Sequence, residues 1–183
     1  MQVRVKLAAA IALAGVMAVG GTAAATGDNG RGVHHGGGGA QFTAFLSGYE
    51  EVPPVSTPAS GTFRATIDTS GAISWELTYR DLSGPPTQAH IHFGQRAVNG
   101  GVSAFLCSNM PGAPAGTQPC PPPPARITGT IGPSEVVGPA AQGIAPGELD
   151  ELVAAMRAGI TYANVHSQPF PDGEMRGQIE PSH

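Results

Sequence analysis

The sequence predicts an all-β protein, an antiparallel β-sandwich or barrel of about eight short strands with one short helix near residues 148–158. Three observations support this fold class. The 183 residues include 27 Gly and 18 Pro, and only 12% are charged, which is unlike a coiled coil or a long-helix protein. Apolar and polar residues alternate in several runs between Gly- and Pro-rich turns. A single stretch has apolar residues at helical spacing.

A β-hairpin is the clearest of the expected elements. In residues 62–67 and 73–79 every second residue is apolar, and the intervening residues 68–71 read Asp-Thr-Ser-Gly. Two such runs around an Asp…Gly turn predict paired strands with one buried face and one exposed face. Similar short runs predict the remaining strands at residues 41–46, 88–93, 102–107, 127–131, 160–166 and 174–179.

One helix is expected at residues 148–158. Leu149, Leu152, Val153 and Met156 fall at positions i, i+3, i+4 and i+7, which lie on one helix face. Acidic residues begin the segment and a basic residue ends it, as the helix dipole favours. Gly159 is suited to end the helix.

The first 40 residues are expected to lie outside this fold. Basic residues followed by an apolar stretch and by Ala23–Ala25 are typical of a secretory signal peptide, so we expect residues 1–25 to be removed. An uncleaved membrane anchor is the alternative, although the apolar stretch is short for one. Residues 26–40 are Gly-rich and predict a flexible linker, and residues 41–181 form the β domain. The mature protein is therefore expected to be secreted, either periplasmic or extracellular, without a membrane span.

Charge and composition exclude several functions. The chain has 9 basic and 13 acidic residues, so no positive field would attract nucleic acid. Lys6 is the only lysine, which excludes a catalytic lysine or a phosphate-loop lysine in the mature protein. The sequence contains no Gly-x-Ser-x-Gly motif, and we expect no catalytic residues.

The two cysteines, Cys107 and Cys120, are expected to form a disulfide because secreted proteins mature in an oxidising compartment. The alternative is a pair of thiolate metal ligands, but zinc ligand pairs are usually closer in sequence.

Three histidines form the candidate metal site. His90 and His92 flank Ile91, and residues i and i+2 of a strand point to the same side. His166 ends another expected strand, and the three imidazoles would converge on copper or zinc if the two strands are neighbours. The alternative is that these histidines make structural hydrogen bonds. Glu174 is either a fourth ligand, a second-shell partner, or the partner of Arg176 or Arg157 in an ion pair.

Five segments in order resemble the CHRD (chordin-type) domain family, first described as a repeat in chordin and also found in secreted bacterial proteins. They are LSGYEEVPP (46–54), GTFRA (61–65), AHIHFG (89–94), GITYANVHS (159–167) and PDGEMRGQI (171–179). Met175 stands where the family typically has Ile or Leu, and residues 107–124 look like an elaboration. The resemblance implies an immunoglobulin-like β-sandwich, and in chordin such repeats belong to an extracellular protein that binds growth factors.

Two functions follow as hypotheses. The first is a non-enzymatic extracellular binding module, in which exposed loops at Tyr49, Glu50, Glu51 and residues 110–124 meet a protein or glycan. The alternative is a secreted copper- or zinc-binding protein, either a metal carrier or a redox protein with a looser likeness to superoxide dismutase. That protein would use His90, His92 and His166.

Overall fold

The computed structural model describes residues 39–182, and eight strands of this part form one antiparallel sheet. The order of strands across the sheet is β5-β4-β7-β8-β1-β2-β3-β6. The strands are β1 (Ala40–Ser47), β2 (Ser60–Ile67), β3 (Ile73–Arg80), β4 (Pro86–Phe93), β5 (Gly101–Ser108), β6 (Ala125–Ile131), β7 (Thr161–Ser167) and β8 (Met175–Pro181). The prediction of an all-β fold with about eight strands and one helix is confirmed.

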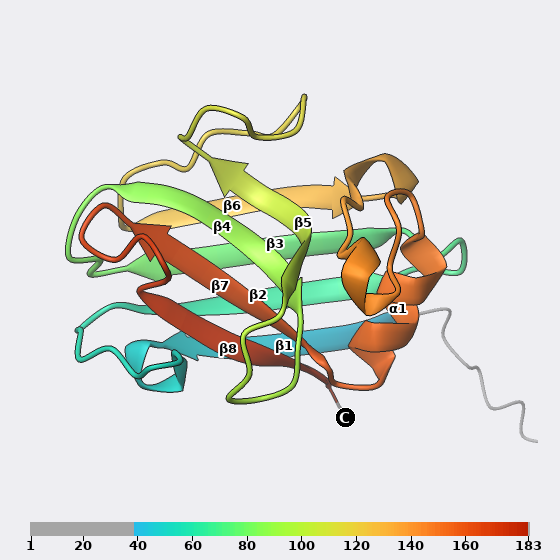
Figure 1. Ribbon diagram of the computed structural model, residues 1–183, viewed down its shortest axis with the longest axis horizontal. Helices are drawn as coiled ribbons and strands as arrows, with labels where there is room; N and C mark the ends of the chain where they lie inside the picture. Colours follow the sequence, from blue (N-terminus) through green and yellow to red (C-terminus); the bar gives the residue numbers. More distant parts are fainter. Residues whose placement is uncertain (1–38, 183) are drawn as a thin grey trace, which may run out of the picture. The chain divides into compact units, whose positions relative to one another are not determined.

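The sheet curls around a single core, so that β5 and β6 at its two edges approach one another (Figure 1). Alternation explains which side chains face inward, because successive residues of a strand point to opposite faces. On β3, for example, Ile73, Trp75, Leu77 and Tyr79 are buried, whereas Ser74 and Arg80 are exposed. The inner face of the curled sheet is therefore the hydrophobic core.

The predicted hairpin is β2 and β3, paired in register from Ser60↔Arg80 to Ile67↔Ile73. The Asp68 carboxylate closes its turn by accepting hydrogen bonds from the Ser70 amide at 2.8 Å and the Ala72 amide at 3.1 Å. Aspartate favours turns because its side chain can bond to backbone amides just after it in the chain.

The helix α1 (Leu149–Arg157) lies at one end of the curled sheet (Figure 1). Its buried residues include the four predicted from their spacing, Leu149, Leu152, Val153 and Met156, which pack into the core. Short 3₁₀ helices η1 (Gly48–Glu50), η2 (Pro133–Glu135) and η3 (Ala140–Gln142) shape the connecting loops. The helix and its bounds match the sequence prediction to within a residue at each end.

The two edge strands are joined by a disulfide loop, residues 108–119, and by the loop that follows it. The predicted disulfide between Cys107 and Cys120 is confirmed. Just before Cys120, the side-chain amide of Gln118 donates to the Leu106 carbonyl of β5 at 3.2 Å and to the Thr128 carbonyl of β6 at 3.0 Å. One side chain therefore bridges the two edge strands, and a separate bridge between Ala104 and Val136 covers another part of the β5 edge.

The expected signal peptide, residues 1–25, and nearly all of the expected linker lie outside the described residues. Within residues 39–182, no helix combines the length and the apolar character needed to cross a bilayer.

Candidate metal centre

The candidate site lies on the outer face of β4 and β7, the face opposite the core. Ala163 and Val165 of β7 point into the core, so Tyr162, Asn164 and His166 point outward. On β4 the core residues are Ala89 and Ile91, and the outward residues include His90 and His92. The two strands are direct neighbours, with Gln88 opposite His166 and His92 opposite Tyr162. The neighbouring strands that the histidine hypothesis required are therefore present.

The three histidines come together in the structure as a buried cluster. One possible ligand nitrogen from each of His90, His92 and His166 lies within 4.8 Å of the others. His90 Nδ1 is 3.2 Å from His166 Nε2. The exposed fractions of the three residues are only 4%, 9% and 8%, in the same order. Loops cover the outer face of the sheet here, so the side chains that point outward are buried as well.

Backbone carbonyls fix the orientation of two of the imidazoles. His92 Nδ1 lies 3.0 Å from the Gly100 carbonyl, and His166 Nδ1 lies 2.8 Å from the Pro171 carbonyl. Because a carbonyl can only accept, both Nδ1 atoms carry the proton, and both Nε2 atoms carry a lone pair. His90 Nδ1 must then donate to His166 Nε2, which leaves a lone pair on His90 Nε2 as well.

Two of these lone pairs have no partner. His90 Nε2 and His92 Nε2 are buried and accept no hydrogen bond from the described residues. Buried polar atoms are normally paired, and an unpaired one costs about 1–3 kcal/mol. A bound cation is the kind of partner that would satisfy both imidazole lone pairs at once.

The cluster keeps its histidines neutral, the state in which imidazole binds metal. Burial lowers the pKa of His90 far below its ordinary value, and the neighbouring His166 and His92 lower it further. Burial also lowers the pKa of His92 to about 4, although its hydrogen bond to Gly100 acts in the opposite direction. The pKa of His166 is lowered by burial against the opposing effect of Pro171. No proton therefore competes for these nitrogens near neutral pH.

The three histidines are close enough to share one metal ion. Each residue offers a possible ligand nitrogen that lies within 4.8 Å of those of the other two. Within the described part of the chain, no carboxylate or thiol joins these three histidines in the cluster. The donor set is three neutral imidazoles, which suits copper or zinc.

A buried ion pair lies on the same outer face. Arg176 Nε of β8 is 3.2 Å from Glu51 Oε2, and Asn164 Nδ2 donates to Glu51 Oε1 at 2.6 Å. The other guanidinium nitrogens of Arg176 donate to the Val98 carbonyl at 3.1 Å and to Asn99 Oδ1 at 2.9 Å. The pair therefore ties the 94–100 loop and the loop after β1 to the sheet.

This ion pair is linked to the histidines through Tyr162. The Tyr162 ring is stacked on His92, with centroids 4.7 Å apart and planes 4° apart. The guanidinium carbon of Arg176 lies 4.7 Å from the centroid of the same ring. The Tyr162 hydroxyl accepts from the Gly100 amide at 3.1 Å, and Gly100 is the residue whose carbonyl holds His92. Tyr162 thus contacts His92 directly through its ring, and its hydroxyl bonds to Gly100, the residue that orients His92.

The predicted site residues outside the cluster have different positions from those expected. Glu51 was expected on an exposed loop, but this was wrong: it is 6% exposed because it pairs with Arg176. Burial raises the pKa of Glu51 to about 7, although Arg176 lowers it. Glu50 is partly exposed and pairs with Arg96, and Tyr49 is 72% exposed.

Glu174 neither joins the cluster nor pairs with an arginine. Its Oε1 accepts from Thr57 Oγ1 at 2.6 Å, from the Ser83 amide at 2.8 Å and from Ser83 Oγ at 2.7 Å. Burial alone would raise the pKa of this carboxyl, but the hydrogen bonds outweigh it and lower the pKa. The alternative of an ion pair with Arg176 or Arg157 was wrong, and Glu174 instead fastens two loops to the start of β8.

Sequence reasoning missed the ion pair and Tyr162. The signal was present in part, since Tyr162, Asn164 and His166 share one face of a strand by period two. A polar outward face, however, ordinarily indicates solvent. The loops that bury it could not be placed from the sequence.

The segments that carry the resemblance stated above meet at this face. Residues 46–54 supply Glu51, residues 89–94 supply His90 and His92, and residues 159–179 supply most of the rest. Searches of curated proteins and of solved structures found no match to the chain. The sequence model of the CHRD domain matches residues 42–179, from the third residue of β1 to within two residues of the end of β8. The chain therefore belongs to the CHRD domain family.

Proposed function

We propose that this CHRD-domain protein is a secreted metal-binding protein that holds one copper or zinc ion on His90, His92 and His166. The observation that carries the proposal is the pair of buried, unpaired lone pairs on His90 Nε2 and His92 Nε2, beside a third imidazole 3.2 Å from the first. A structural role would pair these nitrogens with donors, which the described residues do not supply.

Each surrounding group has a defined part in such a site. The Gly100 and Pro171 carbonyls hold His92 and His166 with their lone pairs inward and raise the basicity of those rings. Burial keeps the three imidazoles neutral, so binding displaces no proton from them near pH 7. A copper or zinc ion would accept the nitrogen lone pairs of the three imidazoles.

Carriage or storage of the metal fits the geometry better than superoxide-dismutase-like redox chemistry. A redox enzyme must expose one side of its metal to a substrate, but the three ligand residues here are each at least 91% covered. The nearby Arg176 is buried and is held by Glu51, Val98 and Asn99, so its guanidinium is not placed at the surface to guide an anionic substrate.

Two features support the part of the proposal that concerns secretion. Both cysteines of the chain are joined in one disulfide, which is typical of proteins that fold in oxidising compartments. The signal-peptide pattern of residues 1–25 agrees with that placement.

The test is metal content and thermal stability of the purified protein. After exposure to Cu or Zn and gel filtration, we expect about one equivalent of metal, and zinc should raise the unfolding temperature because it binds only the folded state. The triple His90/His92/His166→Ala variant should retain none. Gln88→Ala is the matched control, because Gln88 lies on β4 opposite His166 but is not a ligand. Folded wild-type protein that retains no metal would contradict the proposal.

A recognition role for the loops is the second candidate. Two aromatic side chains are strongly exposed, Phe45 at 73% on β1 and Tyr49 at 72% on η1. Exposed aromatic residues on a rigid scaffold are common in binding surfaces. A glycan array probed with wild-type protein and with a Phe45→Ser/Tyr49→Ser variant tests this role. It is supported by a glycan signal that the variant loses, and an equal signal from both proteins would refute it.

A further inference from the structure

The disulfide loop contains a methionine, Met110, as its third residue. Met110 is 46% exposed and is absent from the hydrophobic core, although a long apolar side chain normally gains stability from burial. The proposed metal site as described above does not use this residue. Its position suggests a role for the loop that the family resemblance does not cover.

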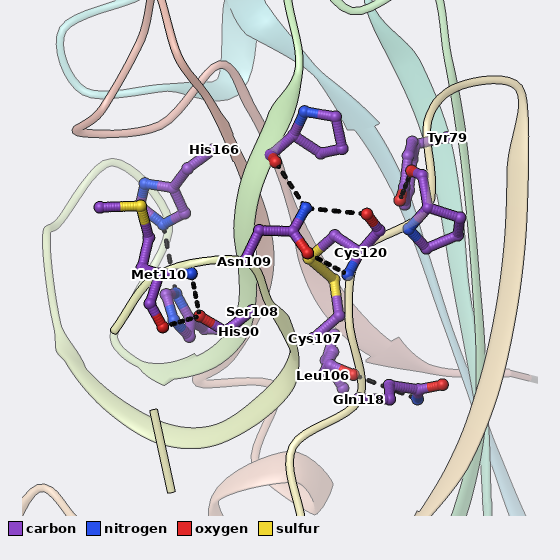
Figure 2. The surroundings of a disulfide bond; sticks show 12 residues. Tyr79, His90, Leu106, Cys107, Ser108, Asn109, Met110, Gln118, Cys120 and His166 are labelled. Atoms are coloured by element: carbon purple, nitrogen blue, oxygen red, sulfur yellow. Dashed lines mark hydrogen bonds between the residues drawn. A yellow bond between two sulfur atoms is a disulfide. The ribbon is translucent and has the colours of Figure 1, made fainter. Parts of the chain in front are cut away.

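The backbone before Met110 is firmly fixed. Asn109, the preceding residue, donates from its backbone amide to the Thr87 carbonyl at 2.8 Å, which extends the pairing of β5 with β4. Its side chain bonds to the Pro86 carbonyl and to the amide and carbonyl of Cys120 (Figure 2). The Met110 amide donates to Ser108 Oγ at 3.1 Å. Together with the disulfide, these bonds hold Met110 in one place on the sheet.

The side chain of Met110 lies on the outer face, in a cavity lined by residues that adjoin His166. Ser108 is opposite Gln88, and Gln88 is opposite His166, so all three lie on the outer face. Met110 lines a cavity of about 370 Å³ with Gln88, Ser167 and Pro171, among others. Pro171 is the residue whose carbonyl holds His166, and in the view of Figure 2 the thioether of Met110 overlaps the His166 imidazole.

We propose that Met110 supplies a thioether ligand to the metal and that the site therefore prefers Cu(I) to Zn(II). This inference rests on the histidine site proposed above. Thioether sulfur is a soft ligand that selects Cu(I), whereas Zn(II) sites are built from imidazole, thiolate and carboxylate. Three imidazoles and one thioether would form a donor set without any negative charge.

The charges around the site also favour a monovalent ion over a divalent one. The cost of burying an ion rises steeply with its charge, and this cluster contains no carboxylate to offset it. Arg176 lies close to this site, with its guanidinium carbon 4.7 Å from the centroid of the Tyr162 ring that is stacked on His92. A second positive charge on the metal would be repelled by this guanidinium, which Glu51 only partly balances.

The experiment compares Cu(I) and Zn(II) affinities of the wild type and a Met110→Leu variant. Cu(I) is titrated without oxygen against a chromophoric Cu(I) chelator, and Zn(II) against a zinc chelator. Leucine keeps the apolar volume but removes the sulfur. We expect Met110→Leu to lose about tenfold or more in Cu(I) affinity with Zn(II) affinity unchanged, as for loss of a group that tunes a metal. X-ray absorption of the Cu(I) protein should show a sulfur neighbour that the variant lacks.

Met156→Leu is the matched control, because Met156 is buried in the core away from this face and should leave both affinities unchanged. Wild-type Cu(I) affinity in Met110→Leu, or a copper spectrum without sulfur, would overturn the thioether ligand while leaving the histidine site intact. A wild-type protein that binds neither ion would overturn the histidine site itself and, with it, this inference.

Discussion

Replacing His92 with glutamine should change how the stability of the metal-free protein depends on pH. In the folded protein the pKa of His92 is lowered from 6.5 to about 4, chiefly by burial. Between these values the unfolded chain binds a proton that the folded protein does not, so acid favours unfolding. The stability is fully present above pH 6.5 and is lost as the pH falls toward 4.

The size of the effect follows from the same shift. Linkage over a pKa lowered from 6.5 to about 4 gives a loss of about 2 kcal/mol in the free energy of unfolding between pH 7 and pH 4.5. His90 and His166 add losses of the same sign, since their pKa values are also lowered. Glu51 opposes them, because its pKa is raised to about 7 and acid therefore favours the folded state at that residue. The contributions of His166 and Glu51 are common to both proteins and cancel in the comparison, whereas that of His90 is slightly smaller in the variant because His92 helps to lower the pKa of His90.

The assay is urea unfolding at pH 7 and at pH 4.5 with a metal chelator present. We expect the wild type to lose about 2 kcal/mol more than His92→Gln between the two pH values. The glutamine variant should also be less stable at pH 7, because it loses the stacking on Tyr162, and only the pH-dependent part is compared. Equal losses in the two proteins would refute the claim that His92 is held neutral by burial.

Three stability predictions follow from other contacts, each measured by chemical or thermal unfolding. Arg176→Met should cost about 3–5 kcal/mol because it leaves the Glu51 carboxylate buried without its cation, and adding Glu51→Gln should recover part of that loss. Replacing Cys107 and Cys120 with serine should cost about 3 kcal/mol, as expected for a loop of this length. Gly173→Ala should cost more than about 1 kcal/mol, since φ is +132° and the new Cβ would lie 2.7 Å from Glu51 Oε1. An unchanged unfolding midpoint would contradict the premise of the variant concerned.

The strands and the helix could be predicted because each has a local pattern. The alternation around residues 68–71 specified the β2–β3 hairpin, and the spacing of Leu149, Leu152 and Met156 specified the buried side of α1. The order of strands could not be predicted. The pairing of β4 with β7 joins residues far apart in the chain, such as Gln88 and His166, and depends on how the whole sheet closes.

Only the part of the candidate site that depends on the alternation of side chains along one strand could be predicted from the sequence. His90 and His92 share a face by alternation, and this much was evident before the structure. Glu51 was placed in an exposed loop because adjacent acidic residues near prolines usually are exposed. Its burial depends on Arg176 from a distant strand, a contact that the local sequence does not encode.

The bridge formed by Gln118 has a consequence for how this protein avoids self-association. An open sheet presents two rows of unpaired backbone groups, which are templates on which the strand of another molecule can add. Gln118 occupies a carbonyl on each of these rows, and the disulfide beginning at Cys107 holds the loop that carries it in place. Reduction would free the loop and uncover the part of each row that it covers, although the bridge between Ala104 and Val136 would still protect the middle of β5. We therefore expect the reduced protein to form intermolecular β-structure under conditions that leave the oxidised protein monomeric.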